Sequence, residues 1–141
     1  MRDLLNNIHP VTIIPPGVAT SDNTAVVSAT VDRLGFGSVT FVILTGTLAD
    51  ADATFAVLVE HGDAANLSDA AAVPDDLLVG TEALAGFTFA DDGKARKVGY
   101  VGGKRYQRVT ITPTGNASAA NLGAVAILGH PVNAPTANPP A

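Results

Sequence analysis

Residues 38–45 read Ser-Val-Thr-Phe-Val-Ile-Leu-Thr, and this stretch is the clearest strand signal in the 141-residue chain. Its nearly continuous apolar content predicts a strand that is buried on both faces or lies centrally in a sandwich. A second strand is predicted at residues 53–60, where Phe55, Val57 and Val59 fall on one face. Because a loop of seven residues separates the two segments, we expect them to form a long hairpin.

Further short strands are expected on both sides of this pair. Residues 25–31 and 123–128 carry small and β-branched apolar side chains, while residues 96–101 and 105–112 flank a glycine turn. The whole pattern gives roughly seven to nine strands at spacings of roughly 8 to 15 residues, with no convincing helix. We therefore expect an all-β protein made of a single antiparallel β-sandwich or jelly-roll-like domain.

The two ends of the chain differ in composition from its middle. Residues 1–23 are expected to form an extended N-terminal arm with a short strand at 11–14, which flanking prolines confine to a sheet edge or a neighbour's surface. Residues 24–131 are expected to form the β-sandwich body. Residues 132–141 are rich in proline, which favours a solvated polyproline II-like tail.

Composition limits the possible partners. Charged residues make up 15 % of the chain, well below the roughly 25 % of an ordinary domain. Such a surface is either covered by a partner subunit or simply neutral, and the sequence leaves both readings open. The net charge of −5 argues against a dedicated nucleic-acid binder, because phosphate contacts need a broad basic field.

The chain contains no cysteine, so disulfides and thiolate metal sites are excluded. Its first residues do not resemble a signal peptide, and no stretch approaches the roughly 20 apolar residues of a membrane span. We expect no membrane association, and synthesis and folding in the cytoplasm.

Catalytic signals are weak. The three histidines (His9, His61 and His130) lie far apart, and no Gly-x-Ser-x-Gly elbow presents a nucleophile. His61 and Asp63 are two positions apart, but no second histidine lies nearby, so a zinc site is not expected, and the acidic turns lack a complete calcium-binding loop. We expect a protein that is not an enzyme and that holds no metal or cofactor.

Positive charge is concentrated in one segment. Six of the eight lysines and arginines lie in residues 94–108, here called the basic segment: Lys94, Arg96, Lys97, Lys104, Arg105 and Arg108. One reading is a solvated hairpin whose cations keep an edge strand from pairing with other chains. The other is a docking face for an acidic partner, in which case charge reversal at Arg105 and Arg108 should weaken binding without destabilising the fold.

A second candidate contact lies in the expected arm. Its proline-flanked strand, with Val11 and Ile13, could extend the sheet of a neighbouring molecule. Val11, Ile13 and the six cations are therefore the expected partner contacts.

Four motifs occur in a particular order: Met-Arg-Asp-Leu-Leu-Asn-Asn-Ile at 1–8, Gly-Phe-Gly-Ser-Val-Thr-Phe-Val-Ile at 35–43, Val-Gly-Tyr-Val-Gly-Gly-Lys-Arg-Tyr-Gln-Arg-Val at 98–109, and Leu-Gly-His-Pro at 128–131. Together they resemble small structural proteins of tailed bacteriophages and prophages that are encoded among the head genes. The resemblance covers nearly the whole chain.

This resemblance implies a virion protein, assembled in the host bacterial cytoplasm. The role it favours is a capsid decoration (cement) protein, which binds the major capsid protein on the outer surface of the icosahedral head and stabilises it. A homo-oligomer is expected, with a trimer favoured. The alternatives are a receptor- or carbohydrate-binding β-sandwich module, or a head–tail or tail structural protein.

Overall fold

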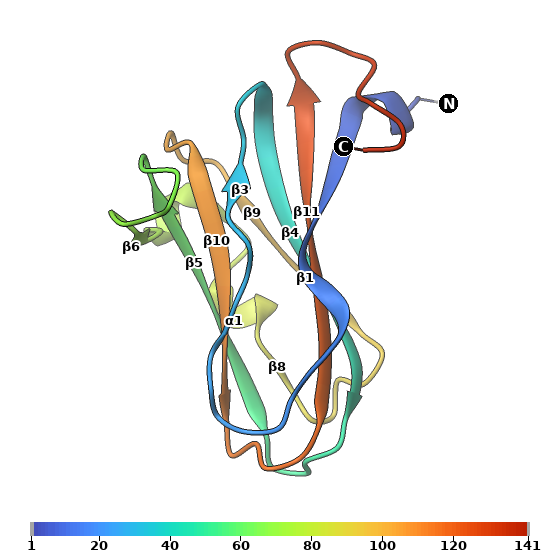
Figure 1. Ribbon diagram of the computed structural model, residues 1–141, viewed down its shortest axis with the longest axis vertical. Helices are drawn as coiled ribbons and strands as arrows, with labels where there is room; N and C mark the ends of the chain where they lie inside the picture. The colour runs from blue at the N-terminus through green and yellow to red at the C-terminus, as the bar shows by residue number, and fades with distance from the viewer. Residues whose placement is uncertain (1, 141) are drawn as a thin grey trace.

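The computed structural model describes residues 2–140 and is nearly all β, with 51 % strand and 7 % helix. Two antiparallel sheets pack face to face (Figure 1). The β-sandwich expected from the strand pattern is thereby confirmed.

Within the described residues, each sheet has its own set of strands. Sheet A has the order β1 (Ile8–Thr20), β11 (Ala120–Pro131), β4 (Phe36–Leu48), β9 (Ala95–Tyr100) and β7 (Leu78–Val79). Sheet B has the order β2 (Val26–Val27), β10 (Tyr106–Thr114), β5 (Thr54–Gly62) and β6 (Ala71–Ala72), with β3 (Val31–Asp32) paired to β10 and β8 (Phe87–Thr88) paired to β5. Short helical turns are η1 (Leu5–Asn7), η2 (Asp75–Leu77) and α1 (Glu82–Ala85).

Strand β4 is the third of the five strands of sheet A, which confirms its expected central place. Burial on both faces, however, was wrong. Phe41 and Ile43 are fully buried, whereas Leu44, the residue after Ile43, points to the other face and is 49 % exposed. The reason is that no further layer covers the outer face of sheet A in the part of the chain that the structure describes.

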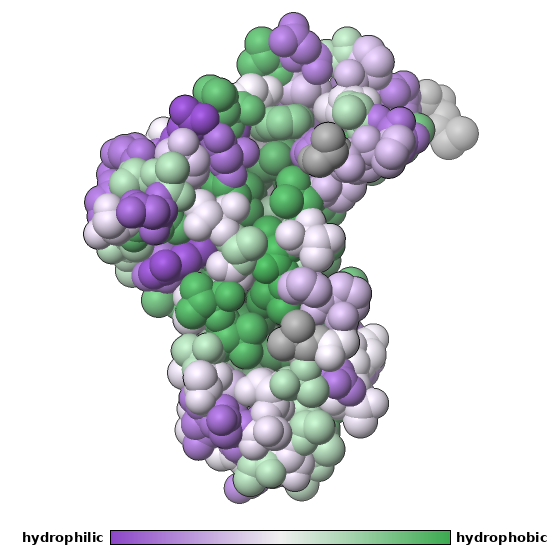
Figure 2. All heavy atoms as spheres, in the orientation of Figure 1, coloured by the Kyte–Doolittle hydropathy of each residue, from purple (hydrophilic) through white to green (hydrophobic). Residues whose placement is uncertain are grey.

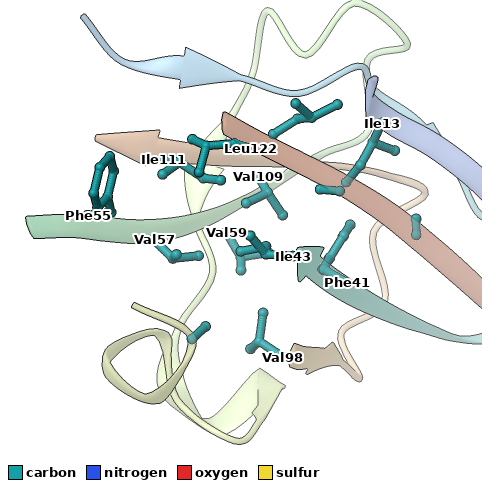
Figure 3. Packing of buried hydrophobic residues seen from close by; sticks show 14 of the residues in the cluster. Ile13, Phe41, Ile43, Phe55, Val57, Val59, Val98, Val109, Ile111 and Leu122 are labelled. Atoms are coloured by element: carbon teal, nitrogen blue, oxygen red, sulfur yellow. The ribbon is translucent and has the colours of Figure 1, made fainter. Parts of the chain in front are cut away.

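The core lies between the inner faces of the two sheets (Figure 3). On β5, Phe55, Val57 and Val59 point inward as their alternation predicts. Phe55 stacks on Phe87 with 4.7 Å between the ring centroids. Most other core side chains are small or β-branched, so the two sheets approach each other through thin layers of aliphatic groups.

The expected hairpins are wrong. Strand β4 belongs to sheet A and β5 to sheet B, so their connection crosses between the sheets, and the same is true of β9 and β10. Each strand has one apolar face. Two consecutive strands can therefore bury those faces against each other from opposite sheets as well as side by side in one sheet, and periodicity alone does not distinguish these cases.

The expected N-terminal arm is also different. Residues 8–20 form β1, which pairs with β11 along its length and is an edge strand of sheet A. On the far side of β1, the N–H of Ala29 donates to the carbonyl of Ile13 at 2.9 Å. In the view of Figure 2, apolar residues run along the middle of the molecule between two more hydrophilic flanks. Residues 8–20 are thus part of the sandwich.

The proline-rich tail lies against the molecule at two points. The Val132 N–H donates to the Gly35 carbonyl at 2.8 Å. Thr136 donates through its N–H to the Asn6 carbonyl at 3.0 Å and through its hydroxyl to the Ile8 carbonyl at 2.6 Å. The expectation of a freely solvated tail therefore does not hold for residues 132–136.

The one-turn helix α1 protects the edge of sheet B. Its N-cap Thr81 accepts a hydrogen bond from the Leu84 N–H at 3.1 Å. The Glu82 carboxylate accepts the Val59 N–H at 2.6 Å, which satisfies a backbone donor at the edge of β5. No helix in residues 2–140 is long and apolar enough to cross a membrane.

Candidate partner-binding surfaces

The basic segment does not form one surface. Lys97 points outward from sheet A, Arg108 points outward from sheet B, and Lys104 and Arg105 lie in the connection between the sheets. Both sequence readings assumed a hairpin, and the two strands of that hairpin are in different layers. A single docking face containing all six cations is therefore excluded in this fold.

Four of the six cations are paired with carboxylates of the same chain. The nitrogen–oxygen distances are 2.6 Å for Arg96–Asp91, 2.7 Å for Lys104–Asp63, 2.7 Å for Arg105–Asp32 and 2.8 Å for Arg108–Glu60. Lys94 and Lys97 have no ion pair with any described residue. Most of the apparent positive charge is compensated within the molecule.

Two of these ion pairs, Arg105–Asp32 and Arg108–Glu60, consist of two hydrogen bonds each and clearly change the pKa of the carboxyl group. Arg105 donates through Nε and Nη2 to both oxygens of Asp32, at 2.8 and 2.7 Å, and these bonds lower the pKa of Asp32. Arg108 donates to Glu60 at 2.8 and 3.1 Å and lowers the pKa of Glu60. Both arginines therefore support the fold, whatever else they contact.

The two residues expected as contacts from the arm are not equivalent. Ile13 is 3 % exposed and belongs to the core, so it is wrong as a surface contact. Val11 is half-buried and packs against the same core. The cause is that β1 directs these side chains between the sheets, whereas the sequence interpretation placed them on a separate arm.

One end of the sandwich gathers exposed apolar side chains that the sequence analysis did not single out. This loop end, at the top of Figure 1, consists of η1, the β3–β4 turn, the β9–β10 connection and the tail. It carries five of the eleven large hydrophobic residues that are exposed in the described chain: Leu4, Leu5, Leu34, Val101 and Val132. Leu34 could have indicated this surface from the sequence, because a turn does not require an apolar residue at this position.

The same end has a small hollow of about 280 Å³ beside Leu34 and Val132. Arg33 borders it and donates to the carbonyls of Lys104 and Gly103 at 2.7 and 2.6 Å. Within the described residues Arg33 has no ion pair. Apolar side chains beside such a cation are suited to a protein partner with apolar and acidic groups.

A buried polar cluster lies below the loop end. His61 of β5 and Tyr100 of β9 are 6 % and 2 % exposed, and the His61 Nδ1 lies 2.9 Å from the Tyr100 hydroxyl. That hydroxyl also accepts the Lys104 N–H at 3.0 Å, and Gln107 donates to the Lys104 carbonyl at 2.6 Å. Burial, and then the positive charge of Lys104, lower the pKa of His61. The cluster connects the two sheets.

Acidic side chains mostly support turns. Asp50 accepts the Ala117 N–H at 2.7 Å, and Asp92 accepts the Leu48 N–H at 2.9 Å. Among residues 2–140, no three His, Asp or Glu side chains are grouped so that they could hold a metal ion.

No protein family model matches the chain, and no curated protein matches its sequence. Among solved structures, the PBSX exported protein XepA is similar, with a TM-score of 0.51 and 16 % identity over 92 % of this chain and 39 % of that chain. A family 35 carbohydrate-binding module from Clostridium thermocellum has a TM-score of 0.45 and 10 % identity over 87 % of this chain and 91 % of that one.

The CBM36-1 domain of a xylanase from the hindgut metagenome of Trinervitermes trinervoides has a TM-score of 0.43 and 14 % identity over 88 % of this chain and 98 % of that one. At these identities the similarity to XepA concerns the fold alone. The chain is a β-sandwich protein.

Proposed function

We propose that this chain is a non-catalytic structural protein of a phage or prophage particle, and that it decorates the outside of the head by binding the major capsid protein. The observation that carries this proposal is the loop end. Clustered apolar side chains exposed to water are characteristic of protein–protein contact sites, and Leu34 and Val132 are 67 % and 77 % exposed.

Two further observations support a phage origin. The ordered sequence motifs resemble phage head proteins, and the fold is similar to that of XepA, described as an exported protein of PBSX. Because this chain covers only 39 % of the XepA chain, the comparison adds support for the class of protein and none for a detailed role.

The form of the molecule suits a protein bound to a repetitive shell. A rigid sandwich loses little conformational entropy when it docks. Many equivalent sites on one particle increase the effective affinity of a contact that is modest in each copy. A partner with apolar and acidic side chains would complement Leu34, Val132 and Arg33.

The test is co-sedimentation of the purified protein with expanded heads of the phage whose head genes flank this one. We expect saturable binding and a higher temperature of head disruption, because a ligand of the assembled state stabilises it. The double variant Leu34→Ser/Val132→Ser should bind at least about tenfold more weakly, since each buried aliphatic side chain contributes on the order of 1.5–3 kcal/mol.

The matched control is Leu58→Ser/Val27→Ser, which removes an exposed leucine and valine from the outer face of sheet B. It should bind heads like the unmodified protein. No binding to heads at saturation, or specific binding to glycans instead of heads, would contradict the proposal.

A further inference from the structure

The outer face of sheet A is apolar although it faces solvent. Cross-strand rows place Val125 beside Val42 and Lys97, and Ile127 beside Thr40 and Gly99. These positions alternate with buried residues of the same strands, so their side chains point away from the core. The face, here called the outer A face, also includes Leu44 and Val79, which are 49 % and 61 % exposed.

Charge is nearly absent from the outer A face. The chain has thirteen acidic residues and a net charge of −5, yet none of these acids occupies an outward position on β1, β11, β4, β9 or β7. Lys97 is its one charged residue. The outer face of sheet B differs, since it carries the Arg108–Glu60 pair and the threonines Thr110 and Thr112.

Glycines leave the outer A face without side chains at Gly99 and Gly129, and a hollow of about 630 Å³ lies beside Thr40, Val79 and Gly99. A Cβ added at Gly99 would lie 3.3 Å from the Cβ of Val79, and one at Gly129 would lie 2.7 Å from the Ser38 hydroxyl. Neighbouring side chains therefore lie across these two positions. An aliphatic sheet face is the kind of surface that packs on another sheet at a distance of about 10 Å.

We infer that the outer A face binds the same face of a second copy of this chain, forming a dimer with a two-fold axis over β4. A surface without acids and with one cation offers little to attract a charged partner, so its complement should be equally neutral. A second copy presents such a face. It is also the surface on which two molecules of net charge −5 repel each other least.

The position of Lys97 agrees with this arrangement. Strand β7 pairs with β9 only at Gly99 and Tyr100, so β9 is the sheet edge at the level of Lys97. A two-fold axis over β4 places the two Lys97 side chains on opposite sides of the contact, where each ammonium group can stay in water. At the other margin, Pro140 of the tail borders the face beside Thr12.

The available area is enough for a weak specific dimer. The three long strands β1, β11 and β4, each about 40 Å long and about 4.8 Å apart, give roughly 500–600 Å² on each copy. Two copies together bury roughly 1,000–1,200 Å², which is the lower limit of specific interfaces. We therefore expect dissociation in the micromolar range. The loop end remains exposed in this dimer, and the inference does not depend on the proposed function.

Charge-swap variants at Thr40 on β4 test this interface by sedimentation velocity between about 1 and 200 µM. The unmodified chain should shift from monomer to dimer across this range. Thr40→Glu and Thr40→Lys should each weaken dimerisation at least tenfold, because the two-fold axis places two like charges together. An equimolar mixture of the two variants should dimerise again, since opposite charges then meet.

The matched controls are Thr112→Glu and Thr112→Lys on the outer face of sheet B, which should dimerise like the unmodified chain. Circular dichroism of each variant establishes that it is folded, and the mixture is a second check, because misfolded variants would not restore each other. A chain that stays monomeric at 200 µM overturns the inference, as does dimerisation that Thr112 variants abolish and Thr40 variants leave intact. A monomer whose binding to heads is abolished by Thr40→Glu would show that another protein covers this face.

Discussion

His61 and Tyr100 form the buried polar contact between the two sheets. The Tyr100 hydroxyl accepts the Lys104 N–H, so its own hydrogen is available to His61 Nδ1 when the imidazole is neutral. The neutral ring then carries its hydrogen on Nε2. A protonated ring would place a charge in a buried site near Lys104, and for this reason the pKa of His61 lies below its ordinary value of 6.5.

Stability should therefore fall as the solution is acidified from pH 7.5 to 5.5. The unfolded chain takes up a proton at His61 near pH 6.5, whereas the folded chain does so only at lower pH, and this difference favours unfolding below pH 6.5. Melting curves should show a lower Tm at pH 5.5 in the unmodified protein and a smaller pH dependence in His61→Gln.

His9→Gln is the control for that experiment and should keep the full pH dependence. The carboxyl groups of Asp32 and Glu60 have lowered pKa values, so their contribution is lost only at more acidic pH. An equal change in Tm between pH 7.5 and 5.5 in His61→Gln and the unmodified protein would exclude His61 as the cause.

Some residue properties could be predicted from sequence and others could not. The inward faces of β5 and β10 follow from alternation, which is local, so Val59 and Val109 were identifiable as core. The ion pairs are not local: Arg105 and Asp32 are 73 positions apart, and Lys104 and Asp63 are 41 apart. The cations were visible in the sequence, while their partners depend on which strands come together.

The connection between β9 and β10 shows why the expected hairpin was wrong. Its glycines resemble a tight turn, but a Cβ at Gly102 would collide with the hydroxyl of Tyr100. Gly102 is needed for this close approach, as the chain passes around a buried tyrosine on its way from sheet A to sheet B. The sequence shows where the chain bends and gives no information on whether it stays in the same sheet.

Strands β5 and β10 are joined by the Arg108–Glu60 pair, which lies at directly opposed positions. Arg108→Ala should lower the free energy of unfolding by about 1 kcal/mol, because it leaves the mostly buried Glu60 carboxylate without its charged partner and with only the Thr110 hydroxyl as a donor. Charge reversal at Arg108 should destabilise more, in contrast to the stability-neutral effect expected from sequence. Urea denaturation at pH 7 measures both.

The acid dependence of the same variant gives an independent measurement. Arg108 lowers the pKa of Glu60, so the pair stabilises the fold above the unfolded pKa of about 4.3 and loses this effect as pH falls through the folded pKa. Arg108→Ala should therefore lose less stability than the unmodified protein between pH 5 and 3. Lys97→Ala, which removes a cation that has no ion pair with any described residue, should change neither measurement.

Across the whole molecule, charge is distributed unevenly between surfaces. Most acids lie in loops and turns, where their carboxylates accept backbone N–H groups, and the outer A face has none. A strand count and an alternation pattern predicted a sandwich correctly. They did not predict this difference between the two outer faces, because it depends on which strands share a sheet.

The two ends of the chain meet at the loop end, and the contact between them is testable by truncation. Deleting residues 132–141 removes the hydrogen bonds of three donors, namely the Val132 N–H, the Thr136 N–H and the Thr136 hydroxyl, which is shared between the Ile8 and Leu5 carbonyls. The tail buries little apolar surface, since Val132 is 77 % exposed. The expected loss is therefore about 1–3 kcal/mol, at about 1 kcal/mol for each bond.

That loss corresponds to a Tm lower by several degrees, which differential scanning calorimetry can resolve. Deleting only residues 138–141 keeps these hydrogen bonds and should change the Tm much less. If the long deletion leaves the Tm unchanged, the tail is free in solution, as the proline content alone suggested. The long deletion should also weaken binding to heads, because Val132 is lost from the loop end, whereas the short deletion should preserve it. A tail that affects the Tm and leaves head binding intact would separate its structural role from the proposed contact.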